Sequence, residues 1–158
     1  MKRILVWALL AAVLCFPDRG TDIGKLLPVE LVAVRREEGV FRVETDTGQC
    51  GLGTTLDAAM AALKNAAPGV VFFDTADYLL LTRETLTAEG LSSFFRPGVR
   101  VLLAEDPVDP EKAAEYLRSR KVGVQLKKLG QTRQILPELS EKNSRLELDT
   151  SVGVSYRG

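Results

Sequence analysis

Apolar and polar positions alternate in two short runs near the start of the main part of the chain. Pro28–Arg35 (PVELVAVR) and Val40–Asp46 (VFRVETD) are rich in strand-forming residues, and residues 36–39 (REEG) join them with a turn-forming glycine. Side chains two residues apart on a strand point to the same face. The two runs therefore predict a β-hairpin, in a sheet that has one covered face.

The periodicity becomes helical after a glycine-containing segment at 47–53. Thr54 with Asp57 three residues later is typical of a helix start, and Pro68-Gly69 of a helix end. The apolar residues between them recur at helical spacing and predict one buried stripe: Leu56, Ala59, Met60, Leu63 and Ala67.

Strands and helices then alternate. Short apolar runs predict strands, and the first of these runs is typical of a strand in the centre of a sheet. Two further segments predict helices: one begins at Thr82, and the other is capped by Asp109-Pro110 and extends to about Arg120. The strand runs lie at 70–73, 77–81, 99–104 and 122–126. This order predicts a single α/β domain over residues 22–128, with an N-terminal hairpin, a mixed sheet of four to six strands and about three helices.

The chain changes character after that domain. Gly130, Pro137 and Gly153 interrupt it, and polar residues gather at 140–144. This pattern predicts a C-terminal tail or linker over residues 129–158. A short helix around 132–140 and an extended segment over 144–156 are the structured alternatives.

The amino terminus has the layout of an export signal. Met1-Lys2-Arg3 is positively charged, Ile4–Phe16 is uninterrupted and apolar, and Pro17 follows at once. A spanning helix needs roughly 18 or more apolar residues, so a permanent transmembrane anchor is the less favoured interpretation. Residues 1–16 therefore predict a signal peptide or lipoprotein signal, and with it an exported, extracytoplasmic protein associated with the cell membrane.

Cys15 closes the apolar run, where a bacterial lipoprotein carries its lipidated cysteine. The residue before it is the bulky Leu14, where a small residue is usual, so cleavage by an ordinary signal peptidase is an equal alternative. Cys15 is the lipidation candidate. Cys50 is the second and last cysteine, and an intrachain disulfide framework is not expected.

Composition removes several function classes. The 158 residues are 46% hydrophobic and 27% charged, which is close to an average soluble domain. Lys plus Arg equals Asp plus Glu at 21 each, so the basic excess of a nucleic-acid-binding protein is missing. The sequence holds no histidine, which excludes Ser-His-Asp and Cys-His nucleophile pairs and most zinc sites. We expect no enzyme, no cofactor and no metal.

Two aspartate motifs resemble a proteolytic signature. Asp46-Thr47-Gly48 and Asp74-Thr75-Ala76 have the pattern of aspartic proteases, in which two carboxylates share one proton. A predicted helix lies between them, whereas such enzymes need β-rich lobes. A turn at Asp46 and a strand end at Asp74 are the favoured interpretation.

Gly48, Gly51 and Gly53 lie between a strand and a helix start, where phosphate-binding loops occur. Neither the dinucleotide nor the P-loop fingerprint is complete. Tight turns with positive φ are the favoured explanation for these glycines.

Cations are concentrated between Glu111 and Arg133. Seven basic residues stand there against two acidic ones, and a solvated helix end explains them most simply. Contact with anionic lipid headgroups is the second interpretation for an exported protein. The basic residues are Lys112, Arg118, Arg120, Lys121, Lys127, Lys128 and Arg133.

Three stretches resemble the N-terminal domain of the Ger(x)C family, the lipoprotein C subunits of bacterial spore germinant receptors. Cys15–Ile23 is similar to the family's lipidated cysteine and the step that follows it, and Leu31–Val34 to its opening hairpin. Gly53–Ala59, Val71–Asp74 and Tyr78–Thr82 are similar to its first helix and the next two strands. Family members are longer and continue into further domains.

The resemblance implies a non-enzymatic, membrane-tethered subunit whose partners are membrane-protein receptor subunits. A second class stays open, namely a small secreted α/β domain that binds a ligand or carries weak hydrolase chemistry through Asp46 or Asp74. Convergent carboxylates in a cleft favour the second class, whereas a smooth or groove-like face favours the first.

Overall fold

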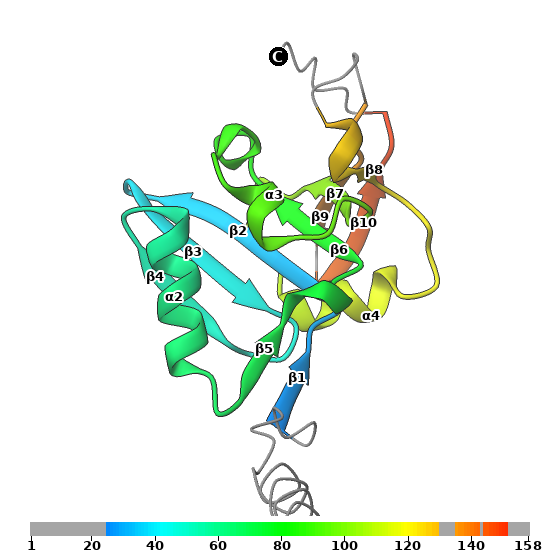
Figure 1. Ribbon diagram of the computed structural model, residues 1–158. Helices are drawn as coiled ribbons and strands as arrows, with labels where there is room; N and C mark the ends of the chain where they lie inside the picture. The colour runs from blue at the N-terminus through cyan, green and yellow to red at the C-terminus, as the bar shows by residue number, and fades with distance from the viewer. Residues whose placement is uncertain (1–24, 130–134, 143, 152–158) are drawn as a thin grey trace, which may run out of the picture.

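The computed structural model describes residues 25–129, 135–142 and 144–151. Its main sheet has eight strands in the order β10-β9-β7-β6-β2-β3-β4, with β8 paired to β7, and β1 pairs with β5 in a separate small sheet (Figure 1). The predicted α/β class with a mixed sheet is confirmed, although the sheet is larger than the four to six strands expected. The strands are β1 Leu26–Pro28, β2 Leu31–Glu37, β3 Val40–Thr45, β4 Cys50–Gly53, β5 Val70–Phe72, β6 Tyr78–Leu81, β7 Arg100–Leu103, β8 Val124–Gln125, β9 Glu138–Lys142 and β10 Arg145–Asp149.

The N-terminal hairpin is confirmed. β2 pairs antiparallel with β3 from Val32↔Thr45 to Glu37↔Val40, and Glu38 and Gly39 between them both have positive φ. A two-residue turn with that geometry matches the twist of the flanking strands. β2 then lies parallel to β6, β6 parallel to β7, and β7 parallel to β9, so these three pairs form the parallel part of the sheet.

The first helix lies on the outer part of the hairpin sheet, as Figure 1 shows. α2 spans Leu56–Ala66, and Thr55, rather than the expected Thr54, caps it by accepting a hydrogen bond from the Ala58 N–H at 3.2 Å. Its buried residues are four of the five predicted ones, Leu56, Ala59, Met60 and Leu63. The predicted stripe therefore faces the core.

The strand expected at 70–73 is present at 70–72, but its expected central position is wrong. Within the described residues β5 pairs only with β1, and of its side chains Val71 alone is buried, while Val70 and Phe72 are 50% and 40% exposed. Phe73 has left the strand for the turn η2 (Phe73–Thr75) and is buried in the core. A short apolar run has the same composition in a central strand and in a two-stranded flap, because only its neighbours differ.

The expected helix from Thr82 is replaced by two short pieces. A 3₁₀ turn, η3 (Thr85–Thr87), follows β6, and the one-turn α3 (Leu91–Phe94) begins after Gly90, whose φ is +91°. The fully buried Thr85 hydroxyl lies 3.0 Å from the Val34 carbonyl oxygen and accepts from the Thr82 N–H at 2.9 Å. These contacts tie η3 to β2 and interrupt a continuous helix.

The third predicted helix is present at its expected start. α4 spans Pro110–Leu117, with Asp109 as the cap that accepts from the Glu111 N–H at 3.0 Å. The Tyr78 hydroxyl of β6 donates to backbone carbonyls at the end of α4, with Leu117 O at 3.0 Å and Arg120 O as partners. α4 is thereby fixed across the sheet.

The tail predicted for 129–158 is wrong over its described middle part. β9 and β10 form an antiparallel hairpin, and β9 joins the main sheet beside β7 through Leu103↔Glu138 and the Leu103 N–H to Pro137 O hydrogen bond. Leu136 and Leu139 are buried. The hairpin holds few apolar residues because it lies at the sheet edge, where only one face is covered.

Two apolar cores lie on the two faces of the main sheet. The larger one is between the sheet and α2, η3 and α3, and includes Val32, Val34 and Leu63. The smaller one is between the sheet and α4, and includes Leu31 and Ala33. Alternation along β2 therefore assigns its odd-numbered residues to the α4 face.

Candidate functional site

The smaller core does not extend along the whole length of β2 and β3 on the α4 face. Beyond Ala33, the next odd-numbered residue of β2 is Arg35, which lies opposite Arg42, and Ala33 itself lies opposite Glu44. On β4, Cys50 and Leu52 pair with Glu44 and Arg42. We call this surface the open face. It consists of Arg35, Glu37, Val40, Arg42, Glu44, Cys50 and Leu52.

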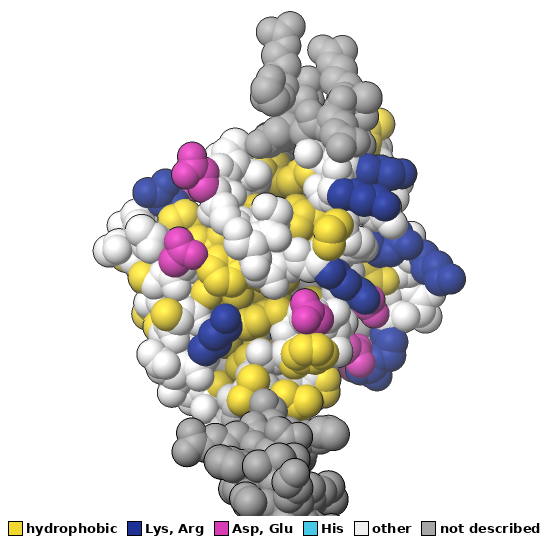
Figure 2. All heavy atoms as spheres, in the orientation of Figure 1, with side chains coloured by type: hydrophobic (Ala, Val, Ile, Leu, Met, Phe, Trp, Pro, Cys, Tyr) yellow, Lys and Arg dark blue, Asp and Glu magenta, His cyan; other side chains and the backbone are white. Residues whose placement is uncertain are grey.

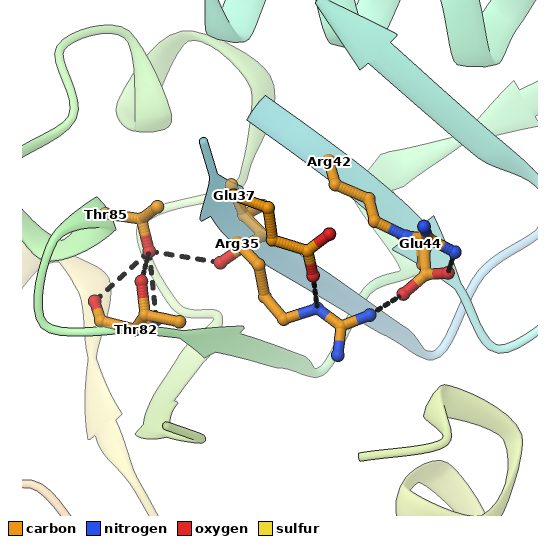
Figure 3. Close-up of polar contacts among 7 residues, drawn as sticks. Arg35, Glu37, Arg42, Glu44, Thr82 and Thr85 are labelled. Carbon is orange, nitrogen blue, oxygen red and sulfur yellow. Dashed lines mark hydrogen bonds and ion pairs between the residues drawn. The ribbon is translucent and has the colours of Figure 1, made fainter. Parts of the chain in front are cut away.

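A network of ion pairs occupies the open face (Figure 3). Glu44 bridges the two arginines, with one carboxylate oxygen on Arg35 Nη2 and the other 2.7 Å from Arg42 Nη2. Arg35 Nε also lies 3.7 Å from Glu37 Oε1. The Glu44 carboxylate raises the pKa of Arg42 above its ordinary value, mainly through this hydrogen bond. The Arg42 guanidinium is therefore charged at every physiological pH.

The network is more buried than a surface ion pair normally is. The side chains of Arg35 and Glu44 are only 12% and 17% exposed. Three of the donor atoms, Arg35 Nε, Arg35 Nη1 and Arg42 Nε, are buried and have no hydrogen-bond partner among the described residues. A buried donor without an acceptor costs about 1–3 kcal/mol. An acceptor from another molecule would satisfy these donors if the arginine side chains turn outward on binding.

The rim of the open face combines apolar and charged groups. Leu52 is 56% exposed, which makes it one of the few large apolar side chains in the described chain that solvent reaches. It lines a shallow hollow together with Glu37, Glu38, Val40 and Arg42. An exposed apolar residue beside a largely desolvated pair of arginines is typical of a protein-binding surface.

A small acidic pocket adjoins the open face at the start of α4. Four carboxylates line it, from Glu44, Asp46, Asp109 and Glu111, together with Cys50. Its volume is about 120 Å³, below the range of about 300–1,000 Å³ that small-molecule sites occupy. No group of His, Cys, Asp and Glu in the described residues has the arrangement of a metal site.

Asp46 is a structural residue in this pocket. The Glu30 N–H is 3.2 Å from each oxygen of its carboxylate, and the Asp46 N–H donates to Leu31 O. Burial raises the pKa of Asp46, and the backbone donors of Glu30 and Leu31 partly oppose that shift. The contacts close the turn after β3 onto the start of β2.

The structure does not bring the two sequence-predicted aspartates into one pocket. Asp74 is exposed in η2 and does not line the pocket that holds Asp46. The neighbouring Thr75 hydroxyl instead binds the backbone of Val29, with N–H and carbonyl contacts at 3.0 and 2.9 Å. The second motif therefore fixes η2 against the chain before β2.

The three candidate glycines have two different roles. Gly48 has φ of +83° in the turn before β4, as a tight turn requires. Gly51 and Gly53 have ordinary φ and lie under α2, where a Cβ atom would be 2.2 Å from Ala59 O and 2.3 Å from Ala59 N, respectively. The expectation of positive φ is thus wrong for these two, and the backbone of α2 occupies the space that a phosphate would need.

The predicted N-terminal signal and the lipidation candidate Cys15 lie outside the described residues. No helix in the described part of the chain is long and apolar enough to span a membrane. Cys50 is a free, exposed thiol on β4.

The charge pattern of the hairpin is the signal from which the open face could have been found. Arg35, Glu37, Arg42 and Glu44 all occupy one face of two paired strands, although polar residues there are ordinarily assigned to solvent. Comparison of the chain with protein-family models, with curated proteins and with solved structures finds no match in any of the three.

Proposed function

We propose that the protein is an exported, membrane-associated and non-catalytic interaction domain, and that the open face is its docking surface. The open face carries this proposal, because it combines buried guanidinium donors that lack acceptors with the exposed Leu52. The charged start and apolar run of residues 1–16 support export.

The chemistry of the open face restricts the partner. A matching surface supplies carbonyl or carboxylate oxygens to Arg35 and Arg42 and an apolar side chain to Leu52. Interfaces with a desolvated arginine and an apolar centre are typical of protein partners. The resemblance to germinant-receptor lipoproteins favours membrane-protein receptor subunits as those partners.

Photo-crosslinking in the native host tests the docking surface. A photoreactive amino acid at Leu52 should form a crosslink to an integral membrane protein, whereas the same amino acid at the exposed Asn65 on α2 should not. The double substitution Arg35→Gln and Arg42→Gln should abolish the Leu52 crosslink while the circular dichroism spectrum stays native. Equal crosslinking from both positions, or none from Leu52, contradicts the proposal.

Cell fractionation and lipid labelling test the membrane association. We expect the chain in the membrane fraction, and a metabolic lipid label on the wild type but not on Cys15→Ser. An unprocessed chain in the cytosol contradicts export, whereas equal labelling of both proteins removes Cys15 as the lipidation site. A chain that is not exported would contradict the membrane association, whereas the crosslinking experiment tests the docking surface independently.

The alternative is a secreted ligand-binding or weak hydrolase domain that uses Asp46 or Asp74. The raised pKa of Asp46 beside other carboxylates favours it. In that case Asp46→Asn and Asp74→Asn would each abolish an acid-pH peptidase activity of the purified protein. We expect no such activity in the wild type.

A further inference from the structure

Two segments that carry cations and no acidic residue lie side by side. Residues 96–104 and 116–129 contain seven Lys or Arg residues between them and no Asp or Glu. β7 and β8 pair these segments, with Arg100 opposite Gln125, and the Lys127 N–H donates to Pro97 O at 3.1 Å. Their charges therefore share one surface.

Only two of these seven cations have an acidic partner among the described residues. Arg96 pairs with Asp77, and Arg118 with Glu30 at 3.0 Å. The other five cations form no ion pair within the described residues, and we call them the basic surface. They are Arg100, Arg120, Lys121, Lys127 and Lys128.

Other contacts hold part of the basic surface in place. Arg100 Nη1 donates to Lys121 O at 3.2 Å, and the Arg120 guanidinium lies 4.3 Å from the ring centroid of Tyr116. The three lysines are exposed. Figure 2 shows dark blue side chains gathered along the flank of the molecule that holds α4 and β8. The charges are thus displayed from a fixed backbone.

A hollow of about 400 Å³ lies within the basic surface. Arg100, Gly123, Val124, Gln125 and Lys128 line it. Gly123 has φ of +98°, and a Cβ atom there would be 2.9 Å from Val101 O, so glycine lets this part of the chain lie close against β7. A guanidinium and an ammonium at one hollow are suited to a phosphate group.

We propose that the basic surface rests on the anionic phospholipid headgroups of the membrane to which the N-terminal segment attaches the chain. This inference rests on the proposed function, because only a tethered domain stays next to the headgroups. Eight residues separate Phe16 from Lys25, and an extended chain spans about 3.3–3.6 Å per residue, so the link reaches about 30 Å. That length lets the flank of a domain of this size turn onto the bilayer.

Overall charge and predicted export favour a lipid surface over nucleic acid as the partner of the basic surface. The whole sequence has no basic excess, whereas a local patch of Lys and Arg suffices at a negatively charged leaflet. The predicted export also removes the chain from nucleic acid. Attraction to such a leaflet falls with ionic strength, because the cations are exposed.

Vesicle partitioning of the full chain tests the proposal. The ratio of the partition coefficients for mixed vesicles with phosphatidylglycerol and for zwitterionic vesicles (phosphatidylcholine) reports the charged groups of the chain. The N-terminal charges at Lys2 and Arg3 are the same in every variant, so a change in the ratio between variants reports the substituted residues. We expect a ratio of about tenfold or more at low salt, falling with added salt. Lys121→Gln, Lys127→Gln and Lys128→Gln together should reduce the ratio by about tenfold.

A matched variant controls for net charge. Arg36→Gln, Lys64→Gln and Lys142→Gln remove the same charge from other surfaces and should leave the ratio within about twofold. An unchanged ratio in the first triple variant overturns the proposal. Abolition of the preference by millimolar inorganic phosphate, at matched ionic strength, shows a site for free phosphate instead, and tighter binding to RNA than to vesicles shows a general polyanion surface. A cytosolic chain in cells contradicts the proposed function but not this ratio.

Discussion

Replacing Gly51 by alanine tests the contact on which the position of α2 depends. A Cβ atom at residue 51 would lie 2.2 Å from Ala59 O and 2.5 Å from Leu63 N. Both are backbone atoms of α2, so no change of rotamer relieves the overlap. Ordinary contact begins at 3.4 Å, and the helix would have to move by about 1 Å.

Overpacking of this kind costs about 1–3 kcal/mol, and more where the neighbours cannot yield. α2 also carries the fully buried Met60 and Leu63 into the larger core, so the helix cannot move without disturbing their packing. We expect Gly51→Ala to lower the free energy of unfolding by about 3 kcal/mol.

Urea unfolding followed by circular dichroism measures this loss. With an m-value of about 2 kcal/mol/M, the midpoint should fall by about 1.5 M. Gly98→Ala is the matched control, because a Cβ atom there meets nothing within 4 Å and its φ is not positive. It should be neutral or stabilising by about 0.4–1 kcal/mol. Equal midpoints for the two variants would refute the packing of α2 on β4.

The remaining predictions concern a core side chain and a buried carboxyl. Leu63→Ala removes a fully buried side chain and should lower the free energy of unfolding by about 2–5 kcal/mol. The Lys64 ammonium lies 5.7 Å from the ring centroids of both Phe73 and Phe94, so Lys64→Ala should lower it by about 0.5–1 kcal/mol. Near-equal urea midpoints for the two variants would contradict a docked helix. For Asp46, burial raises the pKa of the carboxyl in the folded chain above its unfolded value, so its ionisation weakens the fold. The stability of the wild type relative to Asp46→Asn should therefore be greatest below the unfolded-state pKa and fall as the pH rises through the folded-state pKa. Urea midpoints of both proteins between about pH 3 and pH 7 measure it, and a relative stability that increases with pH is the contrary result.

Lys64 lies where the helical pattern predicts it, but it makes contacts that the pattern does not predict. The helical pattern assigns it to the outside of the stripe, where it indeed is exposed. Its ammonium group nevertheless lies over two rings, one from η2 and one from α3. Both rings belong to segments outside α2, so the helical pattern of α2 could not predict these contacts.

The hairpin, α2 and α4 were predictable because their signals are local. Alternation and a two-residue turn specify β2 and β3, and caps with helical spacing specify the two helices. Asp109 caps α4 as expected, and the cap of α2 differs by one residue. Such features depend on residues that are close together in the chain.

Local signals predict the α/β class, the hairpin and the helix faces, because hydrophobic periodicity and helix caps depend on residues that are close together in the chain. Long-range packing is what pairs β5 with β1, joins β9 to β7 and brings the backbone of α2 against Gly51. Long-range packing also ends the smaller core at Ala33 on β2, so that Arg35 lies beyond it with two buried donors that lack a hydrogen-bond partner within the described part of the chain. Each of these features depends on which distant segment packs alongside, and the local residue pattern does not identify that segment.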